Sequence, residues 1–158
     1  MRPGHQIGLR IRNTENRIGY LENIRLHFDE LVRNATFRIR VKKITEQGMP
    51  GEDILHNELI VQPHSLSLNL NIDSLNILFP LEGIFIGIDY VGDGNTYSSI
   101  MDAPPIKVRV TSKSSENNTF FNFMDKVDWI HYKNSRNIQT QITVKFKKLK
   151  VVEITPIN

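Results

Sequence analysis

Apolar and polar residues alternate along much of this 158-residue chain, and this alternation limits the fold more than any other feature. In residues 37–41, Phe, Ile and Val occupy every second position and arginine fills the positions between them. Successive side chains of a β-strand point to opposite faces, so a period of two predicts strands with one buried and one solvated face. The same pattern occurs in residues 9–12, 24–28, 37–42, 65–71, 106–111 and 142–147.

Residues 83–91 differ because they are almost continuously apolar, which predicts a central strand covered on both faces. Helix signals are confined to two short stretches, residues 53–57 and residues 73–79, the second ended by Pro80. Each is long enough for a helical turn and too short for an independent helix. Lys147 and Lys148 break the alternation of the last strand, which indicates a β-bulge there.

Short alternating segments separated by turns predict an all-β fold, a mostly antiparallel sandwich of two sheets. We expect it to be jelly-roll-like, with short helical turns in its loops. Hydrophobic residues make up 39% of the chain, and no shift in composition divides it, so we expect one domain over residues 1–158. No apolar run reaches the roughly 18 residues that a membrane-spanning helix needs.

Motifs of catalysis and cofactor binding are missing from the sequence. Without cysteine, the chain has no disulfide, thiolate metal site or cysteine nucleophile. It has no nucleophile elbow, no P-loop and no dinucleotide-binding glycine pattern. We therefore predict no enzyme activity, no catalytic residue, no metal and no cofactor. The histidines lack metal-site spacing and are expected to be ordinary surface or half-buried residues: His5, His27, His56, His64 and His131.

Two alternatives depend on carboxylates. A calcium site could use the oxygens of Asp89, Asp93, Asn95 and Asp102, although the Asp-Gly-Asn sequence is more typical of a turn. A jelly-roll glycan hydrolase, the less favoured alternative, would need two acidic residues that converge in a cleft. The residues available to it are Glu52, Asp53, Asp89, Asp93 and Asp102.

Basic residues recur at the outward positions of the predicted strands, and the formal net charge is +3. A nucleic-acid platform would also need exposed aromatic residues for stacking. Here Phe28, Phe37 and Phe146 fall on the inward parity, so we predict a solvated face and do not expect nucleic acid as a partner. The outward basic residues are Arg10, Arg12, Arg25, Arg38, Arg40, Lys42, Lys107, Arg109, Lys145 and Lys147.

Aromatic residues concentrate in residues 120–132, which we interpret as a loop, and a second loop covers residues 92–102. Aromatic rings on the rim of a sandwich can stack on sugars or hold a peptide, whereas buried rings would close one end of the core. The predicted ligand-binding residues are Tyr97, Phe120, Phe121, Trp129 and Tyr132.

Residues 35–41, 48–55 and 79–89 carry a family resemblance. The second segment has the pattern G-x-P-x-x-D-φ-L, and the third contains P-x-E-G-φ-F-φ-G-φ followed by an acidic residue. Over roughly residues 6–91 the chain resembles the β-rich module of Bacteroidetes proteins known as carboxypeptidase-regulatory-like, without the regulatory-like domain itself. The resemblance implies a non-catalytic sandwich that is exported to the cell envelope or secreted, and it implies no peptidase activity. The first residues lack the apolar segment of an intact signal peptide, so a cytoplasmic location stays open.

These observations favour a non-catalytic binding or accessory module of a bacterial cell-envelope protein, with a protein or a glycan as its partner. The alternative is a structural or assembly protein whose sheet edges pair with a neighbour. The sequence does not fix the oligomeric state.

Overall fold

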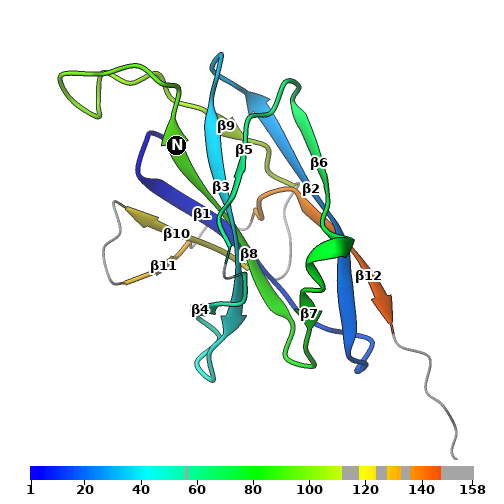
Figure 1. Cartoon of the computed structure of the whole chain (residues 1–158). Helices are drawn as coiled ribbons and strands as arrows, with labels where there is room; N and C mark the ends of the chain where they lie inside the picture. Colours follow the sequence, from blue (N-terminus) through cyan, green and yellow to red (C-terminus); the bar gives the residue numbers. More distant parts are fainter. Residues whose placement is uncertain (56, 112–117, 124–127, 133–135, 147–158) are drawn as a thin grey trace, which may run out of the picture.

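The computed structural model of the chain describes residues 1–55, 57–111, 118–123, 128–132 and 136–146 (Figure 1). Over these residues the chain is built from β-strands, and one short 3-10 helix is the only helix among them. The elements are β1 (His5–Ile11), β2 (Gly19–Glu30), β3 (Thr36–Ile44), β4 (Pro50–Asp53), β5 (Leu59–Val61), β6 (Ser67–Asn71), η1 (Asp73–Leu75), β7 (Leu78–Phe79), β8 (Ile84–Gly92), β9 (Lys107–Val108), β10 (Thr119–Phe123), β11 (Ile130–His131) and β12 (Thr140–Phe146).

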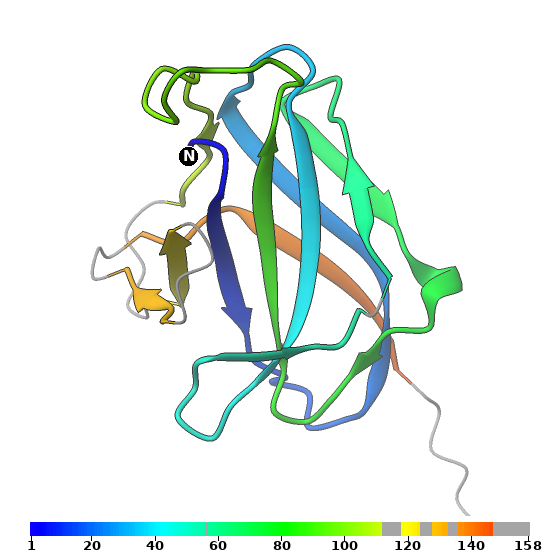
Figure 2. The ribbon, with the colours of Figure 1, turned by 60° about the vertical axis from the view of Figure 1, so that its left-hand side comes forward.

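The strands form two antiparallel sheets that pack face to face (Figures 1 and 2). Sheet A has the order β11-β10-β1-β8-β3-β4, with β5 also paired to β3. Sheet B has the order β12-β2-β6, and β7 and β9 pair with the two ends of β2. This arrangement confirms the predicted all-β, mostly antiparallel two-sheet sandwich.

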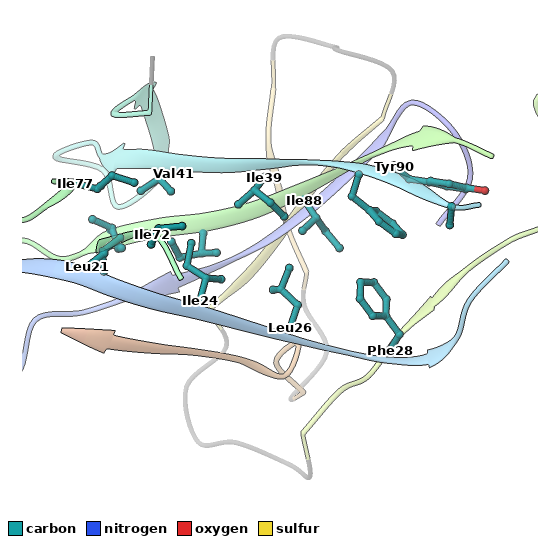
Figure 3. Close-up of a cluster of buried hydrophobic side chains, with 14 of the residues drawn as sticks. Leu21, Ile24, Leu26, Phe28, Ile39, Val41, Ile72, Ile77, Ile88 and Tyr90 are labelled. Atoms are coloured by element: carbon teal, nitrogen blue, oxygen red, sulfur yellow. The ribbon is translucent and has the colours of Figure 1, made fainter. Parts of the chain in front are cut away.

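The core lies between the sheets and is formed by the apolar positions of the alternating segments. Leu26 and Phe28 of β2 face Ile39 of β3 and Ile88 of β8 (Figure 3), and all four are at most 1% exposed. The rings of Phe28 and Phe37 lie 5.1 Å apart, which is within the range of favourable aromatic pairs. The inward parity predicted for β2 and β3 is therefore confirmed.

Strand β8 is buried on both faces from Ile84 to Tyr90, as the apolar run predicts. It lies between β1 and β3, so its isoleucines face the core while Phe85, Gly87 and Asp89 point to the outer face of sheet A. A charged residue in the middle of a buried strand needs partners, and Asp89 finds them on β3.

Three sequence predictions on the course of the chain differ from the structure or fall outside it. Residues 53–57 form no helical turn where they are described, because Pro50–Asp53 is strand β4 and the Ile54 amide donates to the Val41 carbonyl. Only Asp73–Leu75 of the second expected turn is helical, and Leu78–Phe79 is a strand. The bulge expected at Lys147 lies outside the described residues, while the register of β12 with β2 shifts between Thr143 and Val144.

The basic face also differs from its prediction. Arg10, Arg38, Arg40 and Lys42 do point to the outer face of sheet A, but Lys42 is only 8% exposed and is not solvated. Other outward basic residues, such as Arg25, lie on sheet B. The predicted basic residues therefore form no single positive surface.

No described helix has the length and apolar character that crossing a membrane would require.

Gly83, in the turn between β7 and β8, packs tightly against the end of strand β1. Its amide donates to the Pro80 carbonyl, its φ is +86°, and a Cβ there would lie 2.1 Å from the Ile11 carbonyl oxygen. Gly94 has a similar φ of +84°, but a Cβ there would meet no atom within 4 Å.

We expect Gly83→Ala to lower the free energy of unfolding by about 1–3 kcal/mol more than Gly94→Ala does, which is the usual cost of overpacking. Both substitutions share the strain of a left-handed residue, so their difference isolates the clash with Ile11. Urea unfolding followed by circular dichroism measures both values. Equal losses would contradict this account of the turn.

Candidate functional site

An apolar cleft of about 450 Å³ opens between sheet A and strand β9. Along β10 the side chains alternate between the two faces, and Phe121 and Phe123 point to the inner side, where they line the cleft. Ile7 of β1 is the register partner of Phe121, and Val108 of β9 lies on the sheet B side. The cleft thus combines residues that are more than one hundred positions apart in the sequence. The other apolar or aromatic residues that line it are Met1, Ile106, Val110, Tyr132 and Ile138.

The polar groups at the cleft are largely committed to partners within the chain. Asp29 accepts a hydrogen bond from Arg109 at 2.8 Å, and Lys107 contacts Glu30 at 2.6 Å. The hydrogen bond with Glu30 raises the pKa of Lys107, so this amine stays charged. Burial lowers the pKa of His5, so its imidazole is neutral at pH 7. The walls of the cleft suit an apolar group better than a charged one.

The five predicted ligand-binding residues lie in three separate places. Phe121 and Tyr132 do meet at the cleft, with ring centres 5.8 Å apart. Phe120 and Trp129 lie on the opposite, outer face of sheet A, because neighbouring residues of a strand point to opposite sides. Tyr97 lies in the loop after β8. Residues 120–132 are also not one loop, since they contain β10 and β11.

An aromatic cluster on the outer face of sheet A explains the position of Phe120 and Trp129. Phe85 packs edge-on against Trp129 at 4.9 Å and against Phe120 at 6.1 Å. The Phe85 ring lies over Gly8, where a Cβ would come within 2.3 Å of it. His131 stacks on Phe120 at 4.7 Å. These contacts bury Phe85 and Phe120 almost completely and connect β10 and β11 to β8 across the outer face of sheet A.

The loop after β8 is organised around Asp93. Its carboxylate accepts hydrogen bonds from the Tyr97 hydroxyl at 2.6 Å and from the backbone and side-chain amides of Asn95 at 3.1 Å. The bond from Tyr97 holds the pKa of Asp93 below its ordinary value. Asp89, in contrast, points to the outer face of sheet A. Asp89 and Asp93 therefore do not point to one site, and no group of three acidic or histidine side chains in the described part of the chain could hold a metal ion.

Three basic and three acidic side chains form an ionic network on the outer face of sheet A, beside a pocket of about 300 Å³. Arg40 contacts Asp53 at 2.5 Å and Asp89 at 3.7 Å, so it lies between the two carboxylates. Arg38 contacts Asp89 at 3.6 Å and Glu58 at 3.0 Å. Asp53 also contacts Lys42 at 3.1 Å, and the six formal charges cancel. Two of the acidic residues considered for a hydrolase, Asp53 and Asp89, lie in this network with Arg40 between them. This arrangement supports neutralisation of buried charge.

The predicted ligand-binding residues did not include Ile7, Val108 and Phe123, which line the cleft. Alternation in residues 106–111 marks the side to which Val108 points, but it gives no such signal for Phe123, because residues 120–123 hold rings at successive positions. It does not reveal that β10 pairs with β1.

Comparison with protein-family models, with curated proteins and with solved structures finds no match to this chain. The resemblance to the carboxypeptidase-regulatory-like module stays a prediction.

Asp89 and Glu58 contact the same arginine, but their side chains are 8% and 67% exposed. We expect Asp89→Ala to lower the free energy of unfolding by about 1–3 kcal/mol, because the half-buried Arg38 and Arg40 each lose a buried acceptor and keep only their second carboxylate. Glu58→Ala should cost about 1 kcal/mol or less, since exposed ion pairs contribute little. Urea unfolding of the two variants makes the comparison, and losses of the same size would refute the importance of burial.

We expect Tyr97→Phe to raise the pKa of Asp93 toward the ordinary value of 3.8, because the variant lacks the donor. The lowered pKa in the folded chain means that the bond stabilises the fold above this value and that the stabilisation is lost as the pH falls through the folded-state pKa. Titration of the Asp93 carboxyl carbon by NMR gives the shift. Tyr20→Phe on sheet B is the control and should leave the pKa of Asp93 unchanged. If Tyr97→Phe also leaves that pKa unchanged, the hydrogen bond from Tyr97 to Asp93 is excluded.

Proposed function

We propose that this chain is a non-catalytic binding module and that its cleft binds an apolar side chain of a partner protein. The observation that carries the proposal is the apolar lining of the cleft at a place where Phe123 is 41% exposed. Exposed aromatic rings around a concave apolar surface are typical of recognition sites. The resemblance to an exported module favours the bacterial cell envelope as the location.

A protein partner fits this cleft better than a glycan does. Sugar hydroxyls need hydrogen-bond partners, and an unmatched buried hydroxyl costs about 1–3 kcal/mol. Asp29 and Lys107, two of the polar groups at the cleft, are already paired with Arg109 and Glu30. An apolar side chain requires no such partners and gains free energy by leaving water.

The strand arrangement beside the cleft suits an extended peptide. Among the described strands β11 is the outermost on this side of sheet A, and its Ile130 is the register partner of Phe121 and is exposed. A peptide that adds to such an edge gains backbone hydrogen bonds and directs every second side chain toward the same face. The proposed ligand is therefore an extended segment that pairs with β11 and places an apolar side chain in the cleft.

The alternative is an assembly protein that pairs through its sheet edges. Strand β12, with seven residues, lies at the end of the order of sheet B and is the observation that favours it. Sedimentation velocity over a range of concentrations separates the two proposals. A module that binds peptides of another protein keeps one sedimentation coefficient at all concentrations. Self-assembly through β12 makes the sedimentation coefficient rise with concentration.

Selection of random peptides displayed on phage tests the binding proposal. We expect peptides with a shared apolar position to be enriched, and we expect Phe123→Ser to weaken their binding about tenfold or more, as loss of a central aromatic contact does. The matched control is Ile60→Ser, because Ile60 is 45% exposed on β5 of sheet A, away from the cleft. If no peptide is enriched, or if both variants bind the selected peptides like the parent chain, the proposal is wrong.

A further inference from the structure

The outer face of sheet B carries a group of uncharged amide side chains around one arginine. The strand register places Gln141, Arg25 and Asn69 in one row across β12, β2 and β6. The next row holds Thr143, Asn23 and Asn71. We call these six residues the amide face. Their rows span about 10 Å, since neighbouring strands lie about 4.8 Å apart. A hollow of about 390 Å³ is lined by five of them, all except Asn71, together with Ile142.

Arg25 is the feature that separates this face from an ordinary solvated sheet. The other arginines within described strands have partners in the chain: Arg10 donates to Asn118, Arg38 contacts Glu58, and Arg40 contacts Asp53. Arg25 is exposed and makes no hydrogen bond or ion pair with the described residues. Its direct neighbours across the strands, Gln141 and Asn69, are uncharged.

The charges of this face favour a ligand that carries an anionic group. Strand β2 has three acidic residues, and two of them are already paired, Asp29 with Arg109 and Glu30 with Lys107. Glu22 is the third acidic residue, and the two cations Arg25 and Lys145 outnumber it on these strands. A guanidinium binds a carboxylate with two parallel hydrogen bonds, and an exposed, unpaired one is available for that contact.

The amides indicate that the rest of the ligand is rich in hydroxyl groups. A carboxamide offers both donors and an acceptor, and a hydroxyl group does the same, so the two match in either direction. A ligand made only of anionic oxygens would leave the amide oxygens facing negative charge. The side chains of Asn23, Asn69 and Gln141 make no hydrogen bond with the described residues, so they can serve a ligand.

We propose that the amide face of sheet B binds an acidic polysaccharide, with the carboxylate of a uronic acid on Arg25 and neighbouring sugar hydroxyls on Asn23, Asn69 and Gln141. The site lies on the other sheet from the aromatic rings of the cleft, and its ligand is independent of the peptide proposed there.

Affinity electrophoresis of the whole chain in gels containing polygalacturonate, alginate or hyaluronan tests the site. We expect at least one of these polymers to retard the chain, while neutral dextran and the sugar-free polyanion polyglutamate do not. Arg25→Gln keeps a polar side chain with hydrogen-bond donors and loses the charge, and it should weaken binding about tenfold or more. The control Arg33→Gln changes the net charge by the same amount at an exposed residue outside the strands.

Asn69→Ala should weaken binding without any change of charge, which a purely electrostatic contact would not show. The proposal is overturned if none of the three uronic-acid polymers retards the chain. It is equally overturned if polyglutamate binds as well as they do, or if Arg25→Gln and Arg33→Gln lose the same affinity. Circular dichroism of each variant verifies the fold. Phe123→Ser should leave retardation unchanged, so a failure here does not bear on the cleft.

Discussion

Burial of the apolar face of β2 against β3 and β8 is the interaction on which the rest of this structure depends. Each strand contributes side chains from alternate positions, and the rings of Phe28, Phe37 and Tyr90 continue the contact toward one end. Because only alternate residues enter the core, each sheet must present its other residues outward. Everything that could recognise a partner is therefore placed by the same packing that stabilises the fold.

Sheet A differs from sheet B in that its outer face is also covered. The Phe85 ring lies over Gly8, and Asp89 is enclosed by the arginines of β3. A buried carboxylate is tolerated only with compensating charge, which explains why β3 places two arginines on the same face. Sheet B instead leaves Arg25 open to solvent among amides. The two outer faces have the same alternation in sequence and opposite character in the structure.

Alternation was sufficient to predict the fold class and the inward residues of β2, β3 and β12, and the continuous apolar run of residues 83–91 predicted the doubly covered strand β8. Alternation has limits. It failed for Thr119–Phe123, where rings occupy successive positions because Phe120 packs in the outer aromatic cluster and Phe121 lines the cleft. It also failed for Lys42, because outward parity does not reveal that Asp53 lies opposite. Both errors have one physical cause: the period of a strand defines the side of a residue, whereas its surroundings depend on which strands pair.

The cleft follows from a mismatch in the widths of the two sheets. Sheet A extends through β10 and β11 beyond β1, whereas sheet B ends on this side with β12 and β9 (Figure 2). Among the described strands no complete sheet lies opposite the inner face of β10, and Phe123, Ile130 and Tyr132 are exposed. Exposed apolar area is a cost in water that a partner removes. An apolar lining at the uncovered end of a wider sheet is thus the direct consequence of this topology.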